Sequence, residues 1–400
     1  MADLEKIYKE RRDRVYTYMA SNKIALAVFH DSEENREPAL RYLTGLPSDG
    51  VLVLSADGKS TLCPWDENLA RERAFADIVI PFTKYQRSAV EAVKEIAKST
   101  NASGHPIISL SPCTPYPSFK KYEEALKDWT VRCTENDVHS FVKEMRSQKD
   151  EYEIECTKKA CSITSAMTDE ISQMVMQGKL TREIDVALFI ERRLREEGCE
   201  RTSFDTLAAG STRSFAIHAF PGYTASSWGT EGLSILDYGV CYEGYASDCT
   251  ITIARNVNSE QTRILDLVEK AAHECLPLYA PGKPIINAVK KADEIFATAD
   301  RIMPHGLGHG TGLEIHEEPF ISPRGAGEKV FKPGNIVTLE PGLYDPALGG
   351  CRLENDVLIT ETGNEVLTNS KIFRPKPKRI NKKYNIYQYN KKCVYNNRQP

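Results

Sequence analysis

The chain has 400 residues, of which 41% are hydrophobic and 27% are charged, with a formal net charge of -4. Its length exceeds what one hydrophobic core usually organises, so we expect two domains. No apolar run reaches the roughly 20 residues that a membrane helix needs, and the 11 cysteines form no CxxC pair, so we expect no membrane partner, no disulfide framework, and reduced thiols in a cytoplasmic protein.

The first 135 residues alternate between strand-like and helical patterns. Strand-like segments at 24–30 and 50–64 are rich in Val, Ile and Leu, and Asp57-Gly58 within the second favours a tight hairpin turn. Helical patterns at 66–76 and 88–99 follow. No catalytic residue types gather in this half of the chain. The alternation predicts an α/β domain that serves as a scaffold or covers a substrate site.

A composition change predicts a linker at 136–150 and a catalytic domain at 151–373. Within that second domain, helical patterns at 181–198, 261–276 and 286–300 alternate with strands and hairpins. No regular βαβ rhythm is present, so we expect an α+β domain.

The C-terminal segment 374–400 is basic, with nine Lys/Arg, no Asp/Glu and interleaved tyrosines. The rest of the chain then holds 43 basic and 56 acidic residues, a net charge of -13. A basic, aromatic tail is compatible with contact to nucleic acid or an anionic surface, but also with a solvated extension. Because the body is acidic, we expect the extension and no nucleic acid as the main partner.

A first pair of acidic residues flanks a turn in "LSILDYGVCYEGYASDCTITI". If the hairpin turns between Tyr242 and Glu243, Asp237 lies opposite Asp248, with Cβ atoms about 5 Å apart. Two carboxylates that close repel each other, so either one is protonated or a cation lies between them.

A second pair occurs in "VTLEPGLYDPALGGCRLENDVLIT", where a turn centred on Ala347 sets Glu340 opposite Glu354. One such pair alone would fit an exposed hairpin with acidic edges. Both pairs, however, adjoin apolar strand residues that we expect to be buried. Four carboxylates on buried strands indicate bound cations.

The segment "MPHGLGHGTGLEIHEEP" adds three histidines, His305, His309 and His316, on a glycine-rich backbone. Its glycines do not fit GxGxxG, no Lys-Ser/Thr follows as in a phosphate loop, and "HEEPF" lacks the second histidine of HExxH. One imidazole joined to four carboxylates suits two divalent ions such as Mn²⁺, with Co²⁺ and Zn²⁺ also compatible.

Taken together, these residues resemble the metallopeptidase family with the pita-bread fold, which includes methionine aminopeptidase, aminopeptidase P, prolidase and the related creatinase. The shared pattern is an Asp, a second Asp eleven residues on, a His in a GHG setting, and two Glu fourteen residues apart. The matching positions here are Asp237, Asp248, His309, Glu340 and Glu354. The first half, with "RYLTGLPSDGVLVLSADG", is similar to the N-terminal domain of the prolidase and creatinase branch.

This resemblance implies a creatinase-like α/β domain followed by a pita-bread α+β domain, in a homodimer that acts on small peptides. Asp237 would bind one metal ion through both oxygens, and Asp248 and Glu354 would bridge two ions. His309 and Glu340 would complete the second ion's shell. A hydroxide between the ions would attack the scissile bond. Of the relatives, an Xaa-Pro dipeptidase is the most similar.

Further roles follow from the same resemblance. Glu340 would carry the proton from the water to the leaving nitrogen, and His218 and His316 would hold the carbonyl oxygen and the tetrahedral intermediate. Arg352 would orient the carboxylate ligands, and His305 would do the same for His309.

Substrate choice stays open at this point. Prolidases often carry an arginine four residues after the histidine that matches His316, where it binds the carboxylate of a dipeptide. Here that position is Phe320, and Arg324 is the nearest replacement. An apolar Phe320 would also tolerate a longer peptide, as in aminopeptidase P. A hydrolase or lyase of a non-peptide metabolite is a further alternative, whereas the complete ligand set argues against a metal-free creatinase-like enzyme or a non-catalytic binding module.

Overall fold

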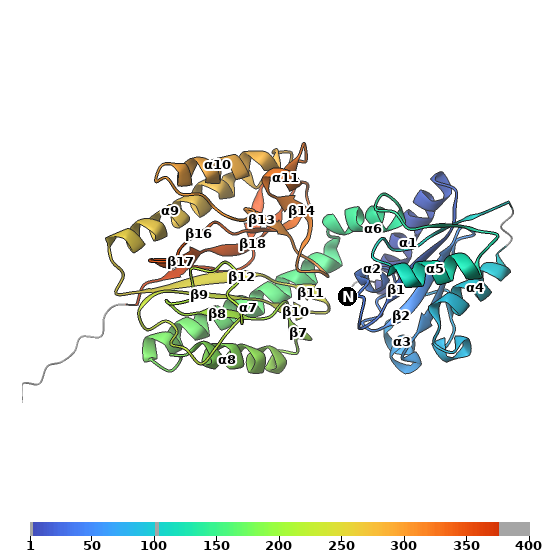
Figure 1. The fold of residues 1–400 in the computed structure, drawn as a ribbon, viewed down its shortest axis with the longest axis horizontal. Helices are drawn as coiled ribbons and strands as arrows, with labels where there is room; N and C mark the ends of the chain where they lie inside the picture. The colour runs from blue at the N-terminus through green and yellow to red at the C-terminus, as the bar shows by residue number, and fades with distance from the viewer. Residues whose placement is uncertain (1–2, 101–103, 376–400) are drawn as a thin grey trace, which may run out of the picture.

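A computed structural model describes residues 3–100 and 104–375, and its two large sheets are each covered by their own helices (Figure 1). The basic tail therefore lies outside the described residues, apart from Arg374 and Pro375. No helix among the described residues combines the length and the apolar composition needed to cross a membrane. The ten cysteines among the described residues are all free.

The N-terminal sheet has six strands in the order β4-β3-β2-β1-β5-β6. Strand β1 pairs antiparallel with β2 and parallel with β5. The predicted hairpin at Asp57-Gly58 forms between β2 and β3, with Gly58 in the left-handed region. The bounds are β1 (Ile24–Asp31), β2 (Gly50–Ser55), β3 (Lys59–Pro64), β4 (Ile78–Val79), β5 (Ile107–Ser109) and β6 (Thr130–Arg132).

Helices cover both faces of this sheet, which explains why every residue of β2 is buried. Alternate residues of β1 belong to different cores: Ala27 and Phe29 pack with α1, α2 and α6, and Leu26 and Val28 pack with α4 and α5. The predicted α/β domain is therefore confirmed. Its helices are α1 (Leu4–Ser21), α2 (Pro38–Thr44), α3 (Glu67–Arg73), α4 (Ala89–Ser99) and α5 (Tyr116–Ala125), and α6 (Val138–Ser147) follows.

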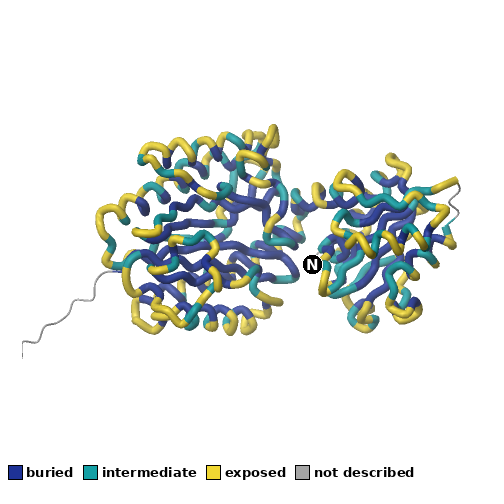
Figure 2. The backbone as a smooth tube through the Cα atoms, in the orientation of Figure 1, coloured by how far each residue is buried: buried dark blue, intermediate teal, exposed yellow. Residues whose placement is uncertain are grey.

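The C-terminal sheet runs in the order β14-β13-β15-β18-β12-β9-β8, with β19 beside β18 and β20 beside β12. Helices α7 and α8 pack on one face and α9 and α10 on the other, so the strands are buried and the outer helix surfaces exposed (Figure 2). The helices are α7 (Glu151–Gln177), α8 (Glu183–Glu196), α9 (Ser259–Cys275), α10 (Ile285–Ala297) and α11 (Pro323–Ala326).

The mixture of helices and antiparallel strands confirms the predicted α+β domain. The strands of the large sheet are β8 (Leu207–Ala209), β9 (Gly232–Tyr238), β12 (Cys249–Arg255), β13 (Gly308–Gly310), β14 (Glu317–Ile321), β15 (Ile336–Leu339), β18 (Glu354–Ile359), β19 (Asn364–Val366) and β20 (Ile372–Phe373). Two smaller sheets contain β7 (Arg201–Thr202), β10 (Val240–Tyr242) and β11 (Tyr245–Ala246), and β16 (Gly342–Asp345) with β17 (Gly349–Arg352).

The first acidic hairpin differs from the prediction in its register. Asp237 pairs with Thr250, not with Asp248, because the turn lies at Glu243-Gly244, one residue later than expected. Both turn residues have positive φ, 48° and 86°, as a two-residue hairpin turn requires. The offset is an even number of residues, so Asp237 and Asp248 still lie on one face of the sheet.

The second acidic hairpin has the predicted register. Leu339 pairs with Asn355 on one side, and Gly342 pairs with Arg352 on the other. These pairings place Glu340 opposite Glu354, as the turn centred on Ala347 predicted.

Helix α6 lies within the proposed linker 136–150, and we keep that segment as the proposed domain boundary. Its buried Arg146 donates to Glu314 at 2.8 Å and also pairs with Glu317. Lys149 lies 3.4 Å from the Glu317 carboxylate. These ion pairs join the helix after the N-terminal sheet to the loop that follows His309.

Replacing Arg146 with methionine should lower the free energy of unfolding by about 3 kcal/mol, because Glu317 then remains buried with only part of its counter-charge. Urea denaturation measures this loss. Arg182→Met is the matched control, because Arg182 pairs with Asp185 at the surface and should cost nothing measurable. Equal stability of both variants would contradict a structural role for the Arg146 pairs.

Candidate metal centre

Five neighbouring strands of the C-terminal sheet each contribute one side chain to a single cluster (Figure 1). In sheet order these are β13, β15, β18, β12 and β9. The side chains lie on a strand or directly beside its end, and we call them the five-residue cluster: His309, Glu340, Glu354, Asp248 and Asp237. Residues separated by more than 100 positions in the sequence meet here because the strands are adjacent.

The ligand-type atoms of this cluster lie close together. One atom each of Asp248, His309 and Glu354 lies within 4.8 Å of the others. The Nε2 atom of His309 is 3.7 Å from a carboxylate oxygen of Asp248 and 3.6 Å from one of Glu340. These separations leave room for an ion between the groups without direct hydrogen bonds among them.

Two carboxylate oxygens of the cluster are buried and have no hydrogen-bond partner among the described residues, Oδ1 of Asp237 and Oδ1 of Asp248. A buried, unpaired carboxylate oxygen is costly unless a cation faces it. The donor set of one imidazole and four carboxylates matches the preference of hard and borderline divalent ions. The residues present therefore fit the predicted metal site.

Burial and mutual repulsion shift the protonation of this cluster in the metal-free protein. Burial, followed by the neighbouring carboxylates, raises the pKa of Asp248 and of Glu354 well above the usual range. Burial also raises the pKa of Glu340 to about 8. Conversely, burial and the nearby His316 lower the pKa of His309 to about 4, so its imidazole is neutral and able to bind a metal.

Arg352 is the cation built into this site. Its buried guanidinium donates to Asp237 at 2.5 Å, to the hydroxyl of Thr250 at 2.9 Å and to the hydroxyl of Tyr344 at 2.7 Å. Thr250 in turn donates to Glu354 at 2.6 Å. Arg352 thus fixes two of the cluster carboxylates, one directly and one through Thr250.

The remaining histidines lie around the cluster. His305 is 3.7 Å from a Glu340 oxygen, and its other nitrogen is 3.0 Å from the Tyr344 hydroxyl; burial lowers the pKa of His305 to about 4. His316 is exposed as a whole residue, and its ring lies 4.3 Å from the ring of His309. Partial burial of the imidazole, followed by the nearby His218, lowers the pKa of His316.

Phe320 and Arg324 lie further along the same segment, on β14 and α11. Both are exposed, and no hydrogen bond or ion pair among residues 3–100 and 104–375 connects either of them to the five-residue cluster. The structure therefore brings nine of the eleven predicted site residues together, and the substrate-binding roles of Phe320 and Arg324 stay predictions.

Asp356 is a buried site residue that the sequence analysis missed. It accepts hydrogen bonds from the backbone N–H of Asp248 at 2.7 Å, from Cys161 at 3.3 Å and from Thr311 at 3.3 Å. Burial raises its pKa to about 7. The available signal was its position two residues after Glu354, which puts both side chains on one face of β18.

An open cleft of about 490 Å³ lies between the two domains, with His316 in its lining. Three arginines also line it. Arg36 pairs with Asp49 and Arg41 with Glu200, whereas Arg201 donates only to backbone carbonyls and has no carboxylate partner in the described part of the chain. The cleft therefore runs from the N-terminal domain to His316, whose ring adjoins that of His309.

Comparison with known proteins identifies relatives of both domains. Residues 155–361 match Metallopeptidase family M24, and residues 11–148 match the Creatinase/Prolidase N-terminal domain. An Xaa-Pro dipeptidase of Pyrococcus furiosus is 31% identical, over 90% of this chain and 98% of the relative. The solved prolidase from Pyrococcus horikoshii is 26% identical with a TM-score of 0.77, covering 91% of this chain and 99% of the other. The X-Pro aminopeptidase from Thermotoga maritima is 25% identical with the same TM-score and coverage.

Proposed function

Because the chain belongs to metallopeptidase family M24 and carries a creatinase/prolidase N-terminal domain, we propose that it hydrolyses the Xaa-Pro bond of dipeptides. The observation that supports this most strongly is the five-residue cluster, with its two buried, unpaired carboxylate oxygens. The relatives named as Xaa-Pro dipeptidase or prolidase support the choice of substrate.

Two divalent ions, Mn²⁺ in our proposal, would be held by the five-residue cluster. When bound, they supply the acidification of a water molecule and the polarisation of the scissile carbonyl. The homodimer and the cytoplasmic location expected from the sequence remain part of the same proposal.

The protein's own groups then move the proton and hold the substrate. Glu340 takes a proton from the attacking water and transfers it to the proline nitrogen, and His305, 3.7 Å away, fixes its orientation. His316 and His218 lie at the open side of the cluster, where a peptide carbonyl arrives. Their ring N–H groups donate to the carbonyl oxygen as negative charge develops on it.

The carboxylate of a dipeptide needs a positively charged partner. Phe320 occupies the position where prolidases often carry an arginine, which leaves Arg324 as the replacement expected from sequence. The cleft adds Arg201 as a second candidate, because it has no carboxylate partner and shares the cleft with His316. Phe320 at the same time favours a second function, the aminopeptidase P activity on longer Xaa-Pro peptides.

Hydrolysis of Ala-Pro and of Ala-Pro-Ala by the Mn²⁺-loaded protein tests the proposal. We expect cleavage of Ala-Pro, with Glu340→Gln reducing kcat by a factor of about 100 or more. Preference for the tripeptide would make the protein an aminopeptidase P. Cleavage of neither peptide would reject both activities and favour a non-peptide substrate.

Two arginine variants then identify the group that binds the carboxylate. The variant that removes this group, Arg201→Met or Arg324→Met, should raise the KM for Ala-Pro about tenfold or more and leave the KM for Ala-Pro-amide unchanged. Equal effects on both substrates would exclude a carboxylate contact at that arginine.

A further inference from the structure

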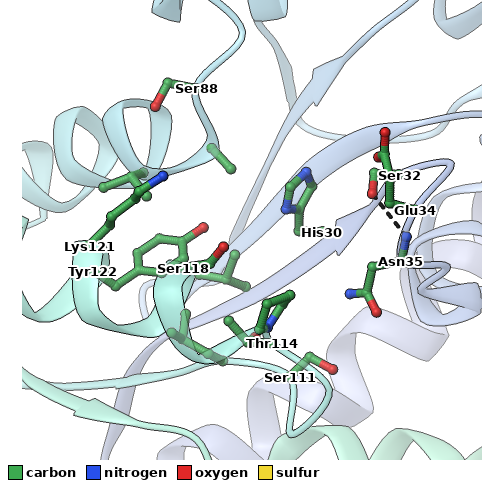
Figure 3. A pocket seen from close by; sticks show the side chains of 15 residues that line it. His30, Ser32, Glu34, Asn35, Ser88, Ser111, Thr114, Ser118, Lys121 and Tyr122 are labelled. Atoms are coloured by element: carbon green, nitrogen blue, oxygen red, sulfur yellow. Dashed lines mark hydrogen bonds between the residues drawn. The ribbon is translucent and has the colours of Figure 1, made fainter.

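A second cavity, of about 340 Å³, lies entirely within the N-terminal domain (Figure 3). It is formed at the carboxyl ends of the parallel neighbours β1 and β5. In the strand order, the chain continues from β1 to β2, away from β5, and from β5 to β6, away from β1. In open α/β sheets, ligands bind at such points, where successive connections diverge.

Two helices begin at this cavity, α4 at Ala89 and α5 at Tyr116. These helices have 11 and 10 residues. The aligned peptide dipoles of each helix place a partial positive charge at its first turn. Pro115 precedes α5 and makes no side-chain capping bond. Pro117 has no N–H, and the N–H groups of Ser118 and Phe119 donate to the Pro115 carbonyl. The start of α5 therefore acts on the cavity mainly through its partial positive charge.

Lys121, one turn into α5, adds a full positive charge to the cavity wall. It forms no ion pair within the described residues, whereas its neighbour Lys120 pairs with Glu123 at 2.5 Å. Glu34 also lines the cavity and lies across from Lys121 in Figure 3. The cavity is thus basic at the α5 end and acidic at the opposite end.

Tyr122 provides an observation independent of the helix ends. Its side chain is only 3% exposed, and its hydroxyl points into the cavity in Figure 3. This hydroxyl makes no hydrogen bond among residues 3–100 and 104–375 and is not one of the fully buried unpaired atoms, so it is accessible from the cavity and free to donate to a ligand. Nearby His30 is half-buried, which lowers its pKa and keeps the imidazole neutral at pH 7.

We propose that this cavity binds a small organic anion, with its carboxylate or phosphate group at the Lys121 end. Lys121 and the Tyr122 hydroxyl donate to the acid group, and the partial positive charge at the start of α5 adds to the attraction. Val28, Val90 and Leu110 form the apolar wall for the rest of the ligand. The volume falls in the range usual for small-molecule sites, and all lining residues lie outside the metal centre.

Isothermal titration of the Mn²⁺-loaded full chain with inorganic phosphate, and separately with propionate, tests this site. We expect at least one of the two anions to bind. Lys121→Met should weaken that binding about tenfold or more, and Tyr122→Phe should weaken it several-fold, because each removes one donor. Binding of phosphate alone or of propionate alone identifies the acid group.

Lys120→Met is the matched control, because it removes the same charge from the same helix outside the cavity. It should bind the anion as the wild type does. An anion that binds at the metal centre instead would bind equally to the wild type and to the Lys121→Met, Tyr122→Phe and Lys120→Met proteins. This result would overturn the proposal. Failure of both anions to bind the wild type would also overturn it, whatever the peptidase assays show.

Discussion

Replacing Asp248 with asparagine is expected to abolish Xaa-Pro hydrolysis and, at the same time, to stabilise the metal-free protein. Asp248 is buried among Glu354, Asp237 and Asp356, and its Oδ1 has no partner among the described residues. The uncharged amide removes like-charge repulsion in the absence of metal, but it also removes a metal ligand. We expect activity to fall by more than about 100-fold, since loss of groups that merely support metal ligands already costs that much.

The stabilising effect depends on pH with a definite sign. The raised pKa of Asp248 means that the folded, metal-free protein binds a proton that the unfolded chain releases above pH 4. Asp248 therefore contributes its full stability below the pKa that it has in the unfolded chain. This contribution is lost as the pH rises through the pKa of Asp248 in the folded protein. Glu340, with a pKa of about 8, and Asp356, with a pKa of about 7, act in the same direction.

Urea denaturation after chelation should therefore show wild-type stability falling from pH 5 to pH 8, with a smaller fall in Asp248→Asn. At pH 8 the variant should be more stable by about 1–3 kcal/mol. Asp266→Asn, at an exposed carboxylate, serves as the control and should change neither activity nor stability. A metal-free Asp248→Asn protein that is less stable than wild type at pH 8 would show that the cluster carboxylates do not repel one another.

Replacing Arg352 with methionine is expected to have the largest destabilising effect in the molecule, about 3–5 kcal/mol in the metal-free protein. The change removes the only guanidinium that contacts Asp237 among the described residues, and also the donors to Thr250 and Tyr344. Added Mn²⁺ should recover part of the loss, because it supplies positive charge at the same carboxylates.

Two further variants separate charge from geometry at this position. Arg352→Lys keeps the charge but not the planar set of donors, so it should be intermediate in stability. Tyr344→Phe removes the hydrogen bonds of this hydroxyl to Arg352 and to His305 and should cost about 1–2 kcal/mol. Urea unfolding with and without Mn²⁺ measures the stability of the Arg352→Met, Arg352→Lys and Tyr344→Phe proteins. If Arg352→Met unfolds like the Tyr344→Phe protein, Arg352 does not neutralise the cluster.

The cluster carboxylates could be predicted from sequence because hairpin pairing is local. Two acidic residues on either side of a turn stay on one face of the sheet under any even change in register. The observed turn at Glu243-Gly244, one residue later than predicted, therefore leaves Asp237 and Asp248 on one face. Glu340 and Glu354 were placed in the correct register because the loop between them is short and centred on Ala347.

Other features depend on contacts between distant segments, which the sequence does not specify. The hydrogen bonds from Arg352 to Asp237 and to the hydroxyl of Thr250 join residues more than 100 positions apart, and nothing local to Arg352 predicts them. The expectation that Phe320 and Arg324 bind substrate came from the resemblance to prolidases. Both residues lie at the exposed surface, on β14 and α11, and their contact with a substrate stays a prediction.

The most direct test of the metal centre is the number of Mn²⁺ ions bound per chain, measured by equilibrium dialysis together with Ala-Pro hydrolysis in the same samples. We predict two ions per wild-type chain, fewer in Asp248→Asn, and activity that rises with occupancy. Unchanged metal binding in Asp248→Asn, or full hydrolysis by the chelated wild type, would contradict a metal-dependent peptidase centred on this cluster.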